Sequence, residues 1–255
     1  MSYLELQPNN KFSNLIDCYW TSKEPISGVH RVLPDGCADL IFNFGEAVIN
    51  FSDNQISVGK ESIAAVGMMT TYRDVFSQHG GDLLGIRFKS GCLSLLTNAS
   101  LSELKNTTIQ ADEIIPAFNK VFLEKLYHTS GTEKRIVLIE KMLSHLLINS
   151  QITNDKLISS VTDLILQSKG QMRIGDIANS VCIGPRQLQR RFETRVGIGL
   201  KEYARVIRFI NTSDTLKNAP QKSILEIAFE NGYYDHAHLS NDFMHMAGFL
   251  PSTLR

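Results

Sequence analysis

The residues best suited to chemistry lie at helical spacing between positions 185 and 196. At about 100° per residue, Leu188 and Phe192 share one face of such a helix. The opposite face carries side chains that can hydrogen-bond base edges, namely Arg186, Gln187, Arg190 and Glu193. Arginine recognises guanine, glutamine recognises adenine, and glutamate accepts a hydrogen bond from cytosine. Arg191 lies beside this face, where a phosphate contact is favoured. The pattern predicts a helix that reads the major groove of double-stranded DNA.

These residues belong to the first copy of a repeat. Each copy predicts a short helix, a tight turn and a second helix, which is the helix-turn-helix arrangement. Pro185 suits the first position of its helix, and Asp235 suits the N-cap of the corresponding helix in the second copy. A helical stretch over residues 200–217 joins the copies. Apolar residues recur 50 or 51 positions apart: Ile177, Ala178, Leu188 and Phe192 in the first copy, and Ile227, Ala228, Leu239 and Phe243 in the second.

The second copy differs in its outward residues and in its charge. Asn241 suits adenine, Met244 suits a thymine methyl group, and His245 adds positive charge below pH ~6.5. Residues 169–222 hold 11 basic and 4 acidic residues, whereas residues 223–255 hold 1 basic and 4 acidic residues. Because phosphate neutralisation supplies much of the affinity for DNA, we expect the first copy to dominate binding.

The composition is that of a folded globular protein. The 255 residues include 26 Lys and Arg and 26 Asp and Glu, and 43% are apolar. These values exclude a disordered or collagen-like chain, and four scattered cysteines without a CxxC pair favour neither a zinc site nor a disulfide scaffold. No apolar run reaches the ~18 residues of a spanning helix, and the first residues lack the features of a signal peptide. We therefore expect a cytoplasmic protein with no membrane partner.

Residues 1–110 are expected to form an antiparallel β-sandwich or small barrel. Apolar and polar residues alternate there with the period of two that is typical of strands. Turn sequences such as Pro34-Asp35-Gly36 separate the segments. The expected strands cover residues 28–33, 37–44, 47–51, 63–68, 72–76 and 83–88.

Residues 111–150 are expected to form two helices, over 112–128 and 132–148, that connect the two parts of the chain or pair with a second copy. The second helix carries an apolar stripe of Ile136, Ile139, Leu143 and Leu146. The stripe packs either on its own domain or on another subunit. Residues 151–255 are expected to be helical throughout. The fold class is therefore α+β: an N-terminal β domain, a helical connector and an all-α domain with two helix-turn-helix motifs.

A family pattern runs through residues 172–255. The residues that carry it are Ile177, Ala178, 185–192 (PRQLQRRF), Gly197, Tyr203, Arg208, Ile227, Ala228, Gly232, Tyr233, 238–240 (HLS), Phe243, Gly248, Pro251 and Arg255. This stretch resembles the C-terminal DNA-binding domain of AraC/XylS-type transcriptional regulators. Residues 33–42 (LPDGCADLIF) and 84–88 (LGIRF) resemble the cupin-like sensor domain of some of these proteins. The resemblance implies a sequence-specific DNA-binding transcriptional regulator with a cupin-like barrel, gated by a small ligand.

Candidate ligand contacts in the β domain are its polar residues Arg31, Asp35, Asp39 and Arg87. A dry pocket with a few converging polar groups would favour ligand gating. The alternative is a DNA-binding regulator whose N-terminal domain only dimerises or binds a protein partner.

A metal-dependent cupin-type enzyme is a third alternative. His238, Asp242 and His245 have i, i+4, i+7 spacing, which brings them near one helix face. In the β domain, His30 and His79 lie in separate segments, whereas a metal-binding cupin needs clustered histidines and a glutamate. No nucleophile elbow, phosphate loop or dinucleotide fingerprint is present. We therefore expect no enzyme activity, no catalytic residue, no metal and no cofactor.

The expected partners are double-stranded DNA, a small-molecule effector, a second copy in a homodimer, and RNA polymerase.

Overall fold

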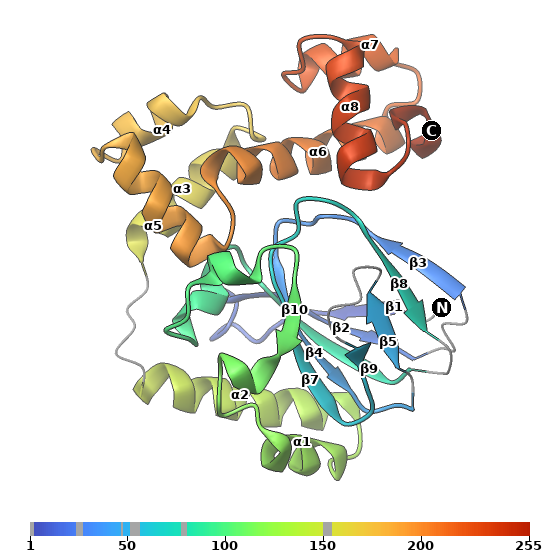
Figure 1. The fold of residues 1–255 in the computed structure, drawn as a ribbon, viewed down its shortest axis with the longest axis vertical. Coiled ribbons are helices and arrows are strands. Elements are labelled where there is room, and N and C mark those ends of the chain that lie inside the picture. Colours follow the sequence, from blue (N-terminus) through green and yellow to red (C-terminus); the bar gives the residue numbers. More distant parts are fainter. Residues whose placement is uncertain (1–2, 24–27, 47, 52–56, 78–80, 150–154) are drawn as a thin grey trace.

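The computed structural model describes residues 3–23, 28–46, 48–51, 57–77, 81–149 and 155–255. The N-terminal part contains two antiparallel sheets and the C-terminal part is helical, which confirms the expected α+β fold (Figure 1). His79 and the first residue of the predicted strand 47–51 lie outside the described residues.

The larger sheet places alternate residues on two faces. Among the described residues, its strand order is β1-β2-β9-β4-β7-β10. On β9, Leu84, Ile86 and Phe88 are buried in a core on one face, while Arg87 lines a cavity on the other. The period of two therefore separates an apolar core from a cavity that contains charged groups. The strands of this sheet are β1 (Tyr3–Leu6), β2 (Ile16–Ser22), β4 (Ala38–Asn43), β7 (Ser62–Val66), β9 (Leu83–Phe88) and β10 (Thr108–Gln110).

A smaller sheet covers the cavity side. Its described strands, in the order β3-β8-β5-β6, are β3 (Gly28–Val32), β8 (Arg73–Ser77), β5 (Ile49–Phe51) and β6 (Ser57–Val58). A small apolar cluster that includes Trp20, Val66 and Val75 lies between the sheets. The predicted sandwich is confirmed, and the six predicted strands match observed strands to within two residues at each end.

The sequence analysis missed β1, β2, β6 and β10. Strand β2 (IDCYWTS) is buried on both faces except at Asp17, so it lacks the alternation that marks the other strands. Strands β6 and β10 have 2 and 3 residues, which is too short to produce a pattern.

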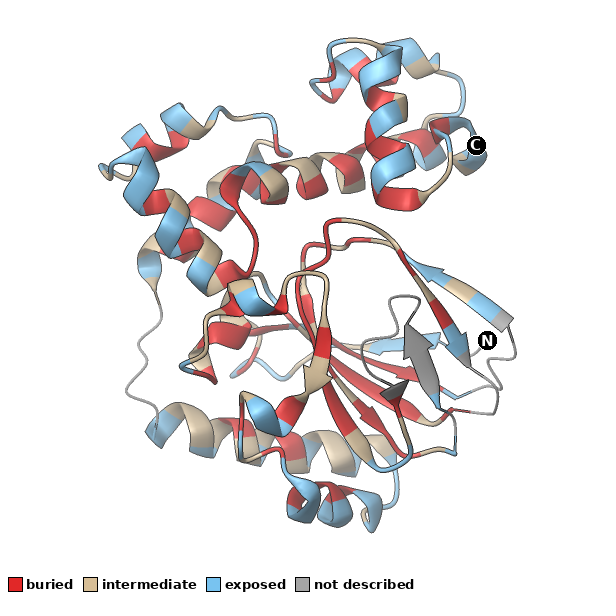
Figure 2. Cartoon of the chain, in the orientation of Figure 1, coloured by how far each residue is buried: buried red, intermediate tan, exposed pale blue. Residues whose placement is uncertain are grey.

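Helices cover the other face of the larger sheet. They are α1 (Lys120–Tyr127) and α2 (Thr132–Asn149), together with the 3₁₀ turns η1 (Cys92–Leu95), η2 (Leu101–Leu104) and η3 (Ala111–Glu113). Ile139 and Leu143 of α2 are fully buried in the same core as the sheet. Figure 2 shows that the central strands beside α2 are mostly buried. The apolar stripe of α2 therefore packs on its own domain.

The predicted helix over residues 112–128 is wrong in its first half. Residues 111–113 form the 3₁₀ turn η3, and α1 begins only at Lys120. Pro116 has no N–H for a helical hydrogen bond. Asn119 then caps α1, because its Oδ1 accepts a hydrogen bond from the backbone N–H of Phe122 at 3.1 Å.

The C-terminal part contains the two predicted helix-turn-helix motifs, α4–α5 and α7–α8. Its elements are α3 (Lys156–Gln167), α4 (Ile174–Ser180), α5 (Pro185–Val196), α6 (Leu200–Asn218), α7 (Ile224–Glu230), α8 (His236–Ala247) and the 3₁₀ turn η4 (Pro251–Leu254). Helix α6 joins the motifs and is about 28 Å long. The repeated residues Leu188, Phe192, Leu239 and Phe243 are all 0% exposed, so the repeat marks two small cores.

Phe192 and Phe243 have equivalent positions in these cores. The Phe192 ring centroid lies 5.5 Å from that of Tyr203, and the Phe243 centroid lies 4.9 Å from that of Phe209. We expect either Phe→Ala change to lower the free energy of unfolding by ~3–5 kcal/mol, because it leaves a cavity. Denaturant unfolding of the full chain measures the loss. Phe229→Ala, at a side chain that is 58% exposed, is the control, and an equal loss in all three variants would contradict the assignment.

Candidate functional site

Helix α5 presents the predicted base-contacting residues on its outward face. Leu188 and Phe192 point into the core, and Arg186, Gln187 and Arg190 are exposed. Neither the Arg186 nor the Arg190 guanidinium has a hydrogen-bond or ion-pair partner in the part of the chain that the structure describes. Both guanidinium groups are therefore available to an external acceptor.

The other polar residues of α5 are more constrained. Arg191 donates hydrogen bonds of 2.6 and 2.8 Å to Asp155, the N-cap of α3. A phosphate contact by Arg191 would have to compete with this ion pair. Glu193 is half-buried. Arg195 donates to the backbone carbonyl of Ser94 in the β domain at 3.5 Å, so the C-terminal end of α5 contacts that domain.

Helix α8 exposes Asn241, Met244 and His245, as the repeat predicts. Asp242 is only 3% exposed, and its Oδ1 accepts a hydrogen bond from Arg205 of α6 at 2.7 Å. The metal-ligand spacing noted in the sequence therefore does not bring His245 and Asp242 to one site. Among the described residues, no group of three or more His, Cys, Asp or Glu side chains is placed to hold a metal ion.

The acidic residues of the second motif take part in its own structure. Glu226 accepts a hydrogen bond from the backbone N–H of Ser223 at the start of α7. Asp235 caps α8 by accepting from the N–H of His238 at 2.7 Å. Glu230 pairs with Lys222. The net charge of residues 223–255 therefore overstates the negative charge that is free to face DNA.

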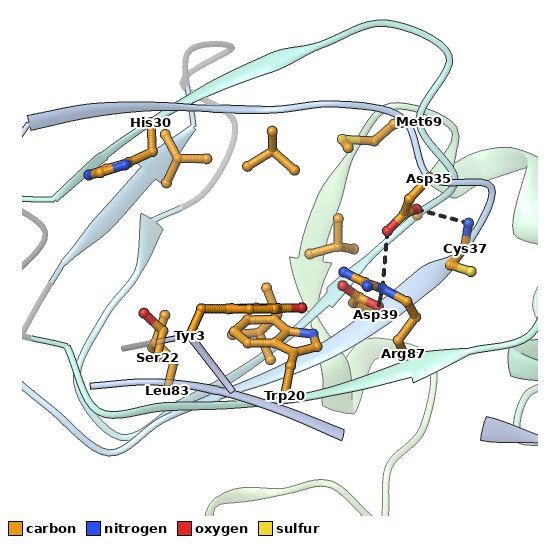
Figure 3. Close-up of a pocket in the computed structure, with 15 residues that line it drawn as sticks. Tyr3, Trp20, Ser22, His30, Asp35, Cys37, Asp39, Met69, Leu83 and Arg87 are labelled. Carbon is orange, nitrogen blue, oxygen red and sulfur yellow. Dashed lines mark hydrogen bonds and ion pairs between the residues drawn. The ribbon is translucent and has the colours of Figure 1, made fainter. Parts of the chain in front are cut away.

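A cavity of about 210 Å³ lies between the two sheets of the β domain. Its walls are mainly apolar, as expected for a small-molecule site. Figure 3 shows polar groups at two ends, with Asp35, Asp39 and Arg87 at one end and His30 and Ser22 at the other. The cavity therefore combines apolar walls with a few converging polar groups.

Arg87 lies among three carboxylates. Its Nε is 3.1 Å from Asp35 Oδ2 and 3.7 Å from Asp39 Oδ1, and its NH1 is 3.5 Å from Glu5 Oε1. Burial lowers the pKa of Arg87, but Asp39 and Asp35 raise it by more. Three of the four predicted ligand residues are thus brought together in one charged cluster.

Asp39 has an unusual protonation state. Burial and the nearby Asp35 carboxylate raise the pKa of Asp39 from 3.8 to about 8, and Arg87 opposes this rise. The indole N–H of Trp20 points toward Asp39 and favours its charged form, which lowers the pKa of Asp39. This contact does not have the geometry of a standard hydrogen bond. Asp39 Oδ1 has no hydrogen-bond partner among the described residues. The environment therefore favours the protonated form of Asp39 relative to a free carboxyl group.

Trp20, Ser22 and His30 line the cavity but were not predicted as site residues. Trp20 and Ser22 lie two positions apart on β2 and so point to the same face of the sheet, but no alternation of apolar and polar residues along β2 marks that face. The indole of Trp20 packs flat on Gly85 of β9, where a Cβ atom would lie 1.9 Å from the ring. Glycine is therefore required opposite Trp20.

The turn over residues 34–37 joins the β domain to the helical domain. The backbone carbonyl of Gly36 accepts a hydrogen bond from Ser90 Oγ at 2.7 Å, and Ser90 also hydrogen-bonds the Tyr203 hydroxyl of α6 at 2.6 Å. Gly36 has a φ of 75°, and a Cβ atom there would lie 3.2 Å from Ile207 of α6. Glycine therefore permits both the turn and its close contact with α6.

A second contact joins the β domain to the C-terminal end of α8. Arg31 does not line the cavity, unlike the other predicted ligand residues. Its NH1 donates to the carbonyl of Ala247 at 3.2 Å, while Asp74 accepts two hydrogen bonds from the same guanidinium. Thr71 Oγ1 donates to the carbonyl of His245 at 2.7 Å. A cation suits this position because the helix dipole is negative at its C-terminal end.

Comparison with known families assigns the helical domain. Residues 177–255 match the family described as a helix-turn-helix domain, and two such motifs joined by one long helix are present. The chain carries an AraC-type helix-turn-helix domain. It is a DNA-binding domain of transcriptional regulators. Residues 4–110 match a domain of unknown function (DUF6597).

Two solved structures have a similar fold. ToxT from Vibrio cholerae has 13% identity and a TM-score of 0.51, covering 92% of this chain and 97% of that chain. ToxT bound to (E)-4-(8-methylnaphthalen-1-yl)but-3-enoic acid has 15% identity and a TM-score of 0.50, with coverage of 92% and 97%. The chain therefore shares the two-domain fold of these structures. No curated protein matches it in sequence. Among the described residues, no helix has the length and hydropathy needed to cross a membrane.

The raised pKa of Asp39 predicts a pH dependence of stability. Because its folded-state pKa of about 8 exceeds the ordinary value of 3.8, the folded protein keeps a proton that the unfolded chain releases. The stabilising contribution is present below pH ~4 and is lost as the pH rises to ~8. We expect Asp39→Asn to flatten the fall in Tm across this window, whereas the exposed control Asp112→Asn keeps the wild-type slope. Equal slopes in all three proteins would contradict the assignment.

Proposed function

We propose that this protein is a sequence-specific transcriptional regulator whose affinity for DNA responds to a small molecule bound in the β-domain cavity. The two helix-turn-helix motifs bind double-stranded DNA, and the β domain is the sensor. One observation carries the gating proposal: the turn over residues 34–37 lines the cavity and also packs on α6. The proposal includes no catalytic step and no cofactor. A homodimer and a contact with RNA polymerase stay predictions from the sequence.

Arg186 and Arg190 are the residues proposed to read bases. Each is exposed on α5 with a free guanidinium, which suits a bidentate contact with guanine. Asn241 and Met244 would make the corresponding contacts from α8. Helix α6 is about 28 Å long. Adding the half-widths of the packed helices gives a separation of α5 and α8 that is compatible with the ~34 Å of one DNA turn. Both helices would then enter successive major grooves on one face of the duplex.

A continuous set of contacts supports a link between the cavity and α5. Asp35 pairs with Arg87 inside the cavity, and the next residue along the turn accepts the hydrogen bond from Ser90. Ser90 bonds Tyr203, whose ring packs against Phe192 of α5. A ligand that alters the Asp35–Arg87 pair would therefore bind one position of the turn more tightly than another. This difference in affinity would shift the population toward the position that the ligand favours.

The packing around this turn supports its movement. A second cavity, of about 350 Å³, lies between the domains and shares Asp35 and Cys37 with the first. Tyr203 and Ile207 of α6 line its other side. Because close-packed cores resist small displacements, an incompletely filled interface leaves the turn room to shift. The fold shared with ToxT adds support, since one of the ToxT structures contains a bound organic acid.

The gating proposal can be tested without knowing the effector, by filling the cavity. Ile41 lines it, and Ile41→Phe would occupy part of its volume. We expect this variant to change the affinity for a selected DNA duplex at least about fivefold, since coupling free energies between sites are typically 1–3 kcal/mol. Adding Ser90→Ala should reduce that change. Val29→Phe, at a side chain that is 58% exposed, is the control. Unchanged DNA affinity in a folded Ile41→Phe variant would instead favour a domain that only dimerises or binds a protein.

The DNA-reading proposal predicts different effects for the two motifs. Arg190→Ala should weaken binding by ~1–3 kcal/mol and relax the preference at one base pair. Arg186→Ala with Arg191→Ala should flatten the dependence of log affinity on log salt, because Arg191 lies where a phosphate contact is favoured and each such contact contributes about −0.9 to the slope. Asn241→Ala with Met244→Ala should alter sequence preference and leave the slope nearly unchanged. Equal loss of slope in both double variants would contradict the assigned asymmetry.

A further inference from the structure

The charges around the cavity restrict what it binds. Glu5, Asp35 and Asp39 lie 3.5, 3.1 and 3.7 Å from the Arg87 guanidinium. One positive group therefore faces three acidic groups, and its charge is already compensated. A ligand carboxylate would be a fourth acidic group beside the cluster, and like charges repel. The cluster instead favours a ligand that brings positive charge.

The wall beside these carboxylates is aromatic. The rings of Tyr3 and Trp20 stack with 6.1 Å between their centroids, and Trp20 is only 8% exposed. The face of an indole attracts cations through its quadrupole, and the attraction grows when the site is shielded from water. An indole next to carboxyl groups is therefore suited to an ammonium group.

Two polar atoms at the other end of the cavity have no partner. Ser22 is 3% exposed, and neither its Oγ nor His30 Nε2 forms a hydrogen bond with any described residue. Figure 3 shows Ser22 and His30 at the end opposite Asp35 and Asp39. Buried polar groups are almost always hydrogen-bonded in native proteins, so these two atoms point to a ligand that supplies the missing partner.

The volume limits the size of the ligand. A cavity of about 150 Å³ is enough to bind benzene. The cavity between the sheets, at about 210 Å³, therefore has room for a single ring with a short chain.

We propose that the cavity binds a small arylalkylamine, in which one aromatic ring carries an ammonium group on a short chain. This inference rests on the proposed function and names the class of effector. The ammonium group lies beside Asp35 and Asp39 against the indole of Trp20, and the ring fills the apolar centre. A hydroxyl group on the ring reaches Ser22 and His30. Any proton on Asp39 passes to solvent as the ammonium group binds, so that the carboxylate and the ammonium group form a neutral pair.

Three probes that share a ring and a two-carbon chain test the inference on the full chain. They are phenethylamine, hydrocinnamate and phenethyl alcohol, which differ in charge. Calorimetry measures each affinity, and the emission of Trp20, the only tryptophan in the sequence, reports occupation of the cavity. We expect phenethylamine to bind at least about tenfold more tightly than the other two, because its hydrogen bonds are charge-assisted. Hydrocinnamate binding as tightly as phenethylamine would overturn the inference, as would no binding of phenethylamine.

The variant Asp39→Asn tests the assigned contact. It should weaken phenethylamine at least about tenfold and leave phenethyl alcohol unchanged, whereas Asp112→Asn should affect neither. An undiminished preference for the amine in Asp39→Asn would overturn the inference. DNA affinity in the same samples separates the two proposals. Amine binding without a change in DNA affinity supports the ligand class and rejects gating. Hydrocinnamate binding that changes DNA affinity supports gating and rejects the ligand class.

Discussion

The half-buried guanidinium of Arg87 is the group around which the β domain is arranged. A buried charge is stable only when it is paired, and the pairing here draws on three separate elements. Asp39 is its cross-strand partner on β4, Glu5 comes from β1, and Asp35 comes from the turn that precedes β4. The same cluster forms one end of the cavity and holds the turn that contacts α6. Cavity, turn and domain interface therefore depend on one set of charges.

The interface also fixes the two recognition helices. The C-terminal end of α5 contacts the β domain through Arg195 and Ser94, and the C-terminal end of α8 contacts it through Arg31 and Thr71. Helix α6 joins the two motifs along one side (Figure 1). Recognition of successive major grooves needs a defined spacing and orientation. Because the β domain holds both helices at their ends, a small change in that domain is sufficient to alter how they meet DNA.

Local patterns in the sequence predicted most of the fold and one half of the site. The alternation of β9 and the spacing of Leu188 and Phe192 follow from the geometry of single elements, so six strands, α5 and its exposed face were predicted correctly. Contacts between residues that are distant in the sequence were not predicted. The partner of Arg191 lies 36 residues away, and Arg31 contacts both Asp74 on β8 and the end of α8, so neither side chain's role can be read from its own strand or helix. Trp20 and Ser22 were missed because β2 is buried on both faces.

The central claim is that the cavity and the recognition helices are coupled, and the emission of Trp20 tests it most directly. Coupling between binding sites is reciprocal, so a cavity that controls DNA affinity must itself respond when DNA binds. Trp20 lies in the cavity wall and is the only tryptophan in the sequence. The account predicts a saturable change in its emission as a duplex selected from random sequences is added to the full chain, and a smaller change in Tyr203→Phe. Emission that stays constant while the wild-type protein saturates with that duplex would contradict it.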